Sequence, residues 1–399
     1  MKKGVKKDYI KFALIEALYF GIFSFTTYQT VFLKDLGITS SQIGMIVSAA
    51  SLAGMLASPV WGMVSDLLHS ARITFWLSAA GTTILFAGLP LISSLFRENI
   101  SILYIYIPAI FIFKQASNSL LDSWCIGTLS PQGIQYGSVR MWGSAGYSLV
   151  SVILGILIGT YCDTETAFYF MLPLLFVLSC FCLNKKKEKN TEKQESDNTR
   201  GLPFLELFAN RQFIFYLLYA FGLNIYLSVT LIFMPYVLEA AGCQPEHVGT
   251  VTGFRALLEI ASMFLGAKLS KKIPIRYIMI MPGLLFGIEH ICYQFAENLP
   301  GVLGIMVFSG LAGGFFYSLG PSYIFEIVPK EVITTAQTIN AMNLTFVSII
   351  GSVAGGFVIR RWGIHTLTTG SGVFILILTA IFIVSIRVFH NNKREKMEC

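Results

Sequence analysis

Charged residues are scarce in this 399-residue chain: Asp, Glu, Lys and Arg together make up only 13% of it. An average soluble protein carries about 25% charged residues. Here 54% of the residues are hydrophobic and the mean hydropathy is +0.67. This shortage of charge excludes an ordinary soluble domain and predicts a chain that lies almost wholly within a membrane.

The patterns that mark metal sites, disulfide frameworks and nucleotide hydrolysis are also missing. The seven cysteines are odd in number and contain no CxxC pair, the five histidines form no HExxH motif, and no Walker sequence occurs. No nucleophile, base and orienting group recur at usable spacing. We therefore expect no cofactor, no metal, no enzymatic activity and no ATP-driven transport by this chain.

Long apolar runs dominate what is present, and about 20 apolar residues suffice for a helix to cross a bilayer. We place twelve spans, at 9–33, 41–64, 73–94, 100–126, 138–160, 165–183, 212–236, 246–268, 275–296, 301–326, 335–359 and 365–388. The predicted fold class is an all-α membrane protein with twelve transmembrane helices.

A polar stretch between the sixth and seventh spans, residues 185–200, has no apolar anchors. We predict a six-helix bundle at 1–183, a cytoplasmic linker at 184–211, and a second six-helix bundle at 212–399 that ends in a short cytoplasmic tail. The stretch SPVWGMVSDLLHSAR (58–72) aligns without gaps with SMFLGAKLSKKIPIR (262–276), which indicates an internal repeat. Two pseudo-symmetric bundles could rock about a site at their interface and give alternating access; a static pore or scaffold is the alternative.

Lys and Arg are distributed unevenly over the predicted loops. With the N-terminus inside, 22 of them fall in inner segments and four in outer loops. The positive-inside rule then puts both termini in the cytoplasm of a multi-pass protein of the plasma (inner) membrane. The net charge of +7 follows from this topology rather than from a nucleic-acid surface. We expect a monomer in membrane lipid, with a small solute and protons as partners.

Two charges lie at matched positions on a predicted helical hairpin. Asp122 and Arg140 each stand nine residues from Pro131, and Ser130-Pro131-Gln132-Gly133 reads as the turn. At helical spacing, one polar face carries Gln115, Asn118 and Asp122, and the other carries Arg140, Ser144, Tyr147 and Ser151. Ionisable groups inside spans point to a functional site. A structural pair that fixes the register of the hairpin is the alternative.

Further ionisable groups lie in other spans. Arg255 and Glu259 stand at i and i+4 on the eighth span, where a buried carboxylate with an Arg partner suits proton coupling; a pair that only neutralises itself is the alternative. On the ninth span, Glu289 is a further coupling candidate, whereas we expect His290 to pack or to hydrogen-bond locally. We expect Glu16 and Lys114 to lie near opposite interfaces and to snorkel to water.

Uncharged polar side chains recur on the first, seventh and eleventh spans, among them Tyr28, Asn224 and Asn340. Hydrogen-bonding groups beside aromatic faces suit a polyhydroxylated or heterocyclic solute. The same groups also suit plain interhelical hydrogen bonds.

Two motifs carry a resemblance to the major facilitator superfamily. The stretch GMVSD, followed by Arg72, resembles its loop motif between the second and third helices, with Gly62 and Asp66 in place and Leu67 where a basic residue is usual. YGSVRMWGSAGY (136–147) resembles the fifth-helix signature of the oligosaccharide/proton symporter (lactose permease-like) branch and the phenylpropionate permease group. The resemblance implies the two-bundle fold and a regulatory role for the loop motif. It also implies that Asp122 and Arg140 bind the solute and that Tyr147 stacks on a sugar ring.

The second half departs from the lactose permease-like pattern. Ala256 stands where that branch has an acidic residue, and Glu289 stands where it has an arginine. Proton coupling would therefore use another carboxylate, and Glu259, tuned by Arg255, is our first choice. The sequence predicts a proton-coupled symporter of a small polar organic solute, with a sugar or glycoside favoured. A proton-coupled exporter of drugs or metabolites, or a non-transporting membrane sensor or scaffold, are the alternatives.

Overall fold

The protein is represented by a computed structural model, which describes residues 3–134, 136–158, 160–183, 207, 209–329 and 332–398. Side chains are described throughout these ranges except at 3, 4, 97, 227, 228, 334 and 389–398. The predicted linker at 184–211 lies outside the described residues apart from 207 and 209–211. Within the described ranges the secondary structure is helical, with one isolated bridge between Ile158 and Cys162 and no strand.

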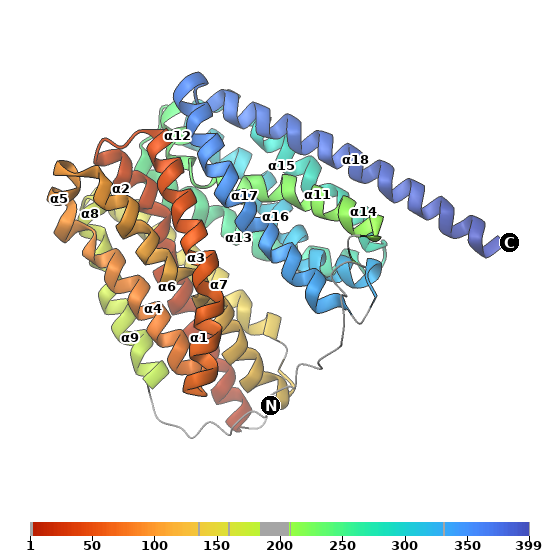
Figure 1. Ribbon diagram of the computed structural model, residues 1–399, viewed down its shortest axis with the longest axis horizontal. Helices are drawn as coiled ribbons and strands as arrows, with labels where there is room; N and C mark the ends of the chain where they lie inside the picture. The colour runs from red at the N-terminus through yellow and green to blue at the C-terminus, as the bar shows by residue number, and fades with distance from the viewer. Residues whose placement is uncertain are drawn as a thin grey trace. The chain divides into compact units, whose positions relative to one another are not determined.

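The chain forms two compact units (Figure 1). Unit 1 comprises residues 1–197 and 246–256, and unit 2 comprises residues 198–245 and 257–399. The described α-helices of unit 1 are α1 (Lys3–Ser24), α2 (Gln29–Asp35), α3 (Ser40–Leu68), α4 (Ala71–Gly88), α5 (Ser93–Glu98), α6 (Leu103–Leu129), α7 (Tyr136–Leu157), α8 (Thr164–Phe168) and α9 (Met171–Leu183). A short 3-10 helix, η1 (Phe25–Tyr28), joins α1 to α2.

Unit 2 contains most of the remaining helices. They are α11 (Arg211–Ile225), the π-helix η5 (Tyr226–Thr230), α12 (Met234–Ala240), α14 (Ile275–Ile278), α15 (Ile280–Cys292), α16 (Leu299–Ile327), α17 (Ile333–Trp362) and α18 (Ile364–Glu398). The helix α13 (Val248–Leu269) is divided between the units, because its residues up to Ala256 belong to unit 1 and those from Leu257 belong to unit 2.

Ten helices in the described part of the chain are long and apolar enough to cross a membrane, and a bent pair raises the number to eleven. The bent pair is Ala71–Gly88 with Pro90–Phe96, which meet at 40°. Pro90 has no backbone N–H to continue the hydrogen bonds of the α-helix, and a 3-10 turn covers Pro90–Ile92 at the break. The apolar run at 212–236 is also not one continuous helix, because it passes from α11 through η5 to α12.

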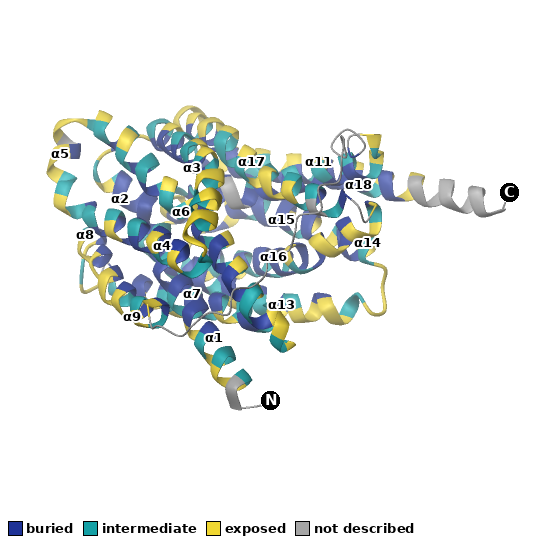
Figure 2. Ribbon diagram, turned by 60° about the horizontal axis from the view of Figure 1, so that its bottom comes forward, coloured by how far each residue is buried: buried dark blue, intermediate teal, exposed yellow. Residues whose placement is uncertain are grey.

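Large apolar side chains lie on the outside of these helices, where Figure 2 shows exposed residues beside buried ones. Leu56 is 66% exposed, Ile105 is 75% exposed and Phe176 is 72% exposed. A soluble protein rarely exposes so many large apolar groups in contiguous patches. Together with the long apolar helices, they indicate a multi-pass membrane protein.

In unit 1, α1 packs closely along α7 (Figure 1). Gly146 of α7 lies directly against the backbone of Ala17, and a Cβ atom at position 146 would collide with the Ala17 carbonyl. At the start of both helices, the Tyr9 hydroxyl donates a 3.0 Å hydrogen bond to the carbonyl of Ser138. Small residues commonly allow such close helix contacts in membranes. This contact places the polar side chains of α7 against α1.

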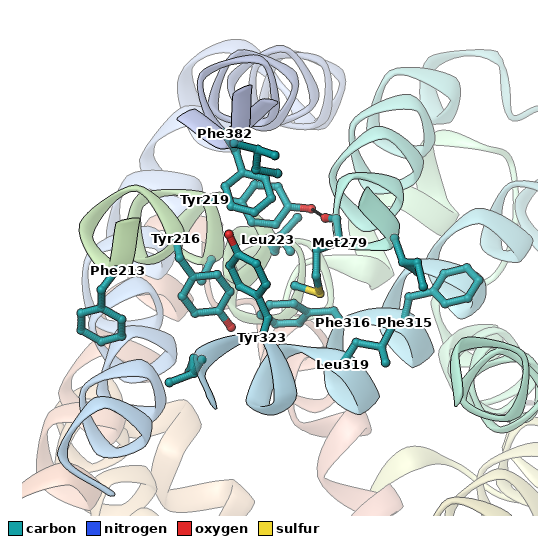
Figure 3. Close-up of a cluster of buried hydrophobic side chains, with 14 of the residues drawn as sticks. Phe213, Tyr216, Tyr219, Leu223, Met279, Phe315, Phe316, Leu319, Tyr323 and Phe382 are labelled. Atoms are coloured by element: carbon teal, nitrogen blue, oxygen red, sulfur yellow. Dashed lines mark hydrogen bonds between the residues drawn. The ribbon is translucent and has the colours of Figure 1, made fainter. Parts of the chain in front are cut away.

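An aromatic cluster forms the core of unit 2 (Figure 3). The ring of Tyr219 stacks on Phe382 with centroids 4.2 Å apart, and its hydroxyl donates a hydrogen bond of 2.5 Å to the carbonyl of Met279. The same hydroxyl accepts a 2.9 Å hydrogen bond from the backbone N–H of Gly283. The cluster thus ties α11, α15 and α18 together.

Candidate functional site

The hairpin between α6 and α7 carries the candidate site. After α6 ends at Leu129, a 3-10 turn covers Ser130–Gln132, and Gly133 adopts a left-handed conformation with φ 74°. Glycine enters this region without steric cost. The predicted turn at Ser130–Gly133 is therefore confirmed, and it sets the positions of Asp122 on α6 and Arg140 on α7.

Asp122 and Arg140 lie in one cluster, but each has a different immediate partner. The hydroxyl of Tyr136 donates a 2.5 Å hydrogen bond to Oδ1 of Asp122. The guanidinium carbon of Arg140 lies 3.9 Å from the centroid of the Phe20 ring on α1, which is a cation–π contact. The two charges still interact electrostatically. The hydrogen bond from Tyr136 was not foreseen, although Tyr136 stands one helical turn before Arg140 in the signature stretch.

Glu16 of α1 joins the same cluster. Its side chain is 0% exposed. A Cβ atom built on Gly143 would lie 2.8 Å from Nη1 of Arg140 and 3.1 Å from Oε2 of Glu16, so both charged groups approach the same glycine. The expectation that Glu16 snorkels to water is wrong, because α7 covers it. Two features of the sequence could have revealed the burial of Glu16. It is an acidic residue within an apolar run, and the fifth predicted span carries two glycines, Gly143 and Gly146, that allow a neighbouring helix to come close.

Lys114 lies on α6, two turns before Asp122. Its ammonium nitrogen is 4.9 Å from the ring centroid of Phe23 and 4.5 Å from that of Phe111. The side chain is only partly exposed. Its charge is therefore held against two aromatic rings.

The uncharged candidates of unit 1 fall into two groups. Tyr147 shares a 2.9 Å hydrogen bond with Thr27, Ser144 is partly buried, and Oδ1 of Asn118 is buried without a hydrogen-bond partner among the described groups. Asn118 lies on α6, one helical turn before Asp122, and Ser144 and Tyr147 lie on α7, one and two turns after Arg140. Tyr28, by contrast, is 0% exposed and donates a 3.2 Å hydrogen bond to the carbonyl of Glu246.

In unit 2, the predicted coupling residue Glu289 is buried. Glu289 accepts a 2.6 Å hydrogen bond from the hydroxyl of Tyr293 and is 0% exposed. Nδ1 of the neighbouring His290 lies 2.7 Å from the carbonyl of Phe286 and therefore carries the proton, which leaves Nε2 to accept from Thr230 at 2.6 Å. The expectation that His290 bonds locally is confirmed.

The remaining polar candidates are placed as follows. Arg255 is 9% exposed and Glu259 is 8% exposed. Asn224 is buried on α11, and Oδ1 of Asn340 on α17 is buried without a hydrogen-bond partner among the described residues. Arg255 falls in unit 1 with Asp122, whereas Glu259, Asn224 and Asn340 fall in unit 2.

The loop motif lies at the end of α3. Gly62 and Asp66 are exposed, and a Cβ atom at Gly62 would meet nothing within 4 Å. His69 ends the helix in a left-handed conformation, and Oγ of Ser70 accepts a hydrogen bond from Ile73 at the start of α4, close to Arg72. The motif therefore forms a capped, exposed turn between two helices.

Chemically, the cluster combines carboxylates, a guanidinium, hydroxyls, an amide and aromatic rings. Carboxylates accept hydrogen bonds and guanidinium groups donate them, so both partners of a solute hydroxyl are present. In the described part of the chain, no three His, Cys, Asp or Glu side chains are arranged to hold a metal. The site suits a small polar organic solute.

The comparisons with known proteins agree with this architecture. The chain is 23% identical to an uncharacterized transporter, YwbF, of Bacillus subtilis over 82% of this chain and 79% of the relative. It is 22% identical to a maltose permease of Geobacillus stearothermophilus over 87% and 88% of the two chains. The solved structure of the nucleoside transporter NupG matches with a TM-score of 0.78 at 16% identity, over 94% of this chain and 98% of that one.

A second solved structure, a bacterial homolog of the human lysosomal transporter Spinster, matches with a TM-score of 0.74 at 14% identity over 98% of both chains. Both structural matches show the fold. The model of the MFS_1 like family matches residues 9–369, which is most of the sequence. The chain therefore belongs to the MFS_1 like family of major facilitator transporters.

Proposed function

We propose that this transporter carries a small polar organic solute into the cell by proton-coupled symport and alternating access. The observation that carries the proposal is the cluster of Glu16, Asp122, Tyr136 and Arg140 inside an otherwise apolar unit. Charged groups within membrane spans are costly, and in membrane proteins they mark substrate and ion pathways.

A sugar or glycoside is the favoured solute class. Sugar hydroxyls both donate and accept hydrogen bonds, and the cluster offers a carboxylate, a guanidinium and the amide of Asn118 to meet them. Beside these groups, Tyr147 presents an aromatic face and Ser144 a hydroxyl. The names of several relatives, which are maltose, lactose, sucrose, raffinose and melibiose permeases, support the same class.

Alternating access is proposed on the basis of a twelve-span, two-bundle arrangement. In it, the broken runs at 73–94 and 212–236 each count as one span, and the bundles at 1–183 and 212–399 are pseudo-symmetric, joined by the linker at 184–211. The positive-inside distribution of Lys and Arg supports cytoplasmic termini and the plasma membrane. We further propose a monomer, in which the turn containing Gly62, Asp66 and Arg72 controls the conformational change.

The roles of the side chains follow from their chemistry. Asp122 and Arg140 would bind solute hydroxyls, with Tyr28, Asn224 and Asn340 as further polar contacts. Glu259, tuned by Arg255, would carry the coupled proton, and Glu289 is a second candidate for that role. A buried carboxylate with an adjustable cationic partner can take up and release a proton as its surroundings change.

The test is transport by the purified chain in vesicles. Solute counterflow with a panel of maltose, lactose, raffinose, uridine and 3-phenylpropionate identifies the substrate, and a pH-sensitive dye outside the vesicles reports proton movement. Symport predicts that the outside becomes alkaline as the solute enters. Extrusion against the proton gradient would favour the exporter, and binding without counterflow would favour a sensor or scaffold.

A further inference from the structure

Glu16 is a buried carboxylate to which neither the sequence motifs nor the relatives assign a role. Its side chain is 0% exposed, and among the described residues neither carboxylate oxygen has a partner in good hydrogen-bond geometry. The Cys125 thiol, a weak donor, lies beside it. An ionised carboxylate without hydrogen bonds in an apolar interior is very costly, and protonation removes most of that cost. Burial therefore favours the protonated form of Glu16, as a proton-binding site requires.

The groups that face Glu16 come from α6 and α7, which pack against α1, and from α1 itself. Arg140 approaches it from α7 across Gly143, and the charge of Asp122 acts on it from α6. The other titratable neighbours are the Cys125 thiol of α6, the Tyr136 hydroxyl of α7 and the Tyr19 hydroxyl of α1 itself. On α9, the Cys182 thiol faces Lys11 and Arg72 instead.

The charge balance of this cluster is uneven. Two carboxylates, Glu16 and Asp122, share a single guanidinium, that of Arg140. Asp122 already receives a hydrogen bond from Tyr136, which stabilises its negative charge, whereas Glu16 has no comparable donor among the described residues. Of the two carboxylates, Glu16 is therefore the one that remains protonated while Asp122 is ionised.

We propose that Glu16 is a proton-binding residue of unit 1, located beside the solute-binding side chains. When Asp122 and the solute engage Arg140, Glu16 keeps its proton. While Arg140 rests on the Phe20 ring, as it does in this structure, Glu16 also holds its proton. When Arg140 leaves that ring and moves to Glu16 during the conformational cycle, the O–H bond of the carboxyl breaks, the proton passes to water, and the carboxylate that remains pairs with the guanidinium. The exchange with solute rests on the proposed function, whereas the proton site itself does not.

Infrared difference spectroscopy of the purified protein in lipid tests the site without any solute. A protonated carboxyl buried in an apolar surrounding has a C=O stretching band at a frequency distinct from the stretching bands of an ionised carboxylate. We expect such a band in the wild type at neutral pH, its loss in the Glu16→Gln variant, and its retention in Glu98→Gln, whose side chain is exposed. A band that is absent from the wild type, or that persists in Glu16→Gln, overturns the proposal.

Transport measurements separate this site from the proposed function. If Glu16 exchanges its proton with solute, Glu16→Gln vesicles should lose at least tenfold in proton-driven accumulation and keep solute counterflow. Unchanged accumulation in this variant would overturn the coupling role. If no solute in the panel is transported by the wild type, the proposed function fails, while the infrared band still decides whether Glu16 holds a proton.

Discussion

Asp122 shows how a single hydrogen bond can prepare a charged group for binding. The Tyr136 hydroxyl donates a 2.5 Å hydrogen bond to Oδ1 of Asp122 and does not use Oδ2, the other carboxylate oxygen. Arg140, meanwhile, rests on the ring of Phe20. Both charged groups thus keep hydrogen-bonding capacity that a direct, fully satisfied ion pair would consume. In our account the solute hydroxyls use this capacity.

Replacing either charged group should abolish solute uptake. Asp122→Asn removes an anionic acceptor and Arg140→Lys removes the guanidinium fork, and a hydrogen bond to a charged group contributes about 1.5–3 kcal/mol. We expect affinity for the transported solute to fall by about tenfold to a hundredfold, while insertion into the membrane is unchanged. Uptake assays with Glu98→Gln as the control test this, and normal uptake by either variant would contradict the assigned roles.

A milder change should follow from Tyr136→Phe. This variant keeps the ring and removes only the hydroxyl that bonds to Asp122, at a cost of about 1 kcal/mol or somewhat more. Solute affinity measured by equilibrium binding should fall by about five- to tenfold. Tyr169→Phe, at a half-exposed position on the surface of unit 1, is the matched control and should bind normally. Equal affinity in the two variants would show that the Tyr136 hydroxyl has no part in binding.

How far the sequence predicts the site differs between residues. The positions of Asp122 and Arg140 followed from counting back and forward from the turn at Pro131, because a short turn fixes the register of two helices. Glu16 was misplaced, since hydropathy gives depth along a span but does not say which face another helix covers. Only the close packing of α1 on α7 explains its burial.

At the level of elements, that packing depends on glycines in α7. Gly146 leaves no room for a side chain against Ala17, whereas a Cβ atom at Gly137 on the same helix would meet nothing within 4 Å. The two positions therefore differ in packing while they share residue type and helix.

We expect Gly146→Ala to destabilise the protein by about 1–3 kcal/mol, because the added methyl forces the two helices apart. Gly137→Ala should leave stability unchanged or raise it by up to about 1 kcal/mol, since alanine favours helices. Thermal unfolding in detergent compares the two variants. A stability loss of the same size in both would mean that the α1–α7 contact does not depend on Gly146.

The helices themselves were largely predictable from hydropathy, and the exceptions have local causes. The run at 73–94 bends at Pro90, which the sequence displays but whose angle it does not give. The run at 212–236 leaves α-helical geometry at Tyr226–Thr230, where the backbone forms a π-helix. Average hydropathy does not detect this change, because the hydrogen-bond register of the backbone can shift while the apolar composition stays the same.

For the molecule as a whole, the central question is which carboxylates connect solute movement to proton movement. Glu259 and Glu289 belong to unit 2 and Glu16 to unit 1, so each unit supplies at least one candidate. If Glu259 carries the coupled proton, Glu259→Gln should fail in gradient-driven accumulation, by tenfold or more, and should retain solute exchange. Vesicle assays of both activities decide this, because an equal loss of the two would assign Glu259 to solute binding or to folding.

The most direct test of the whole account is proton movement in vesicles that contain only the purified wild-type chain. The external pH is followed while each solute of the panel is added in turn, and counterflow of the same solute is measured in parallel. Proton-coupled symport predicts that at least one solute shows counterflow and makes the outside alkaline as it enters. A solute that exchanges rapidly while the external pH stays constant would contradict proton coupling.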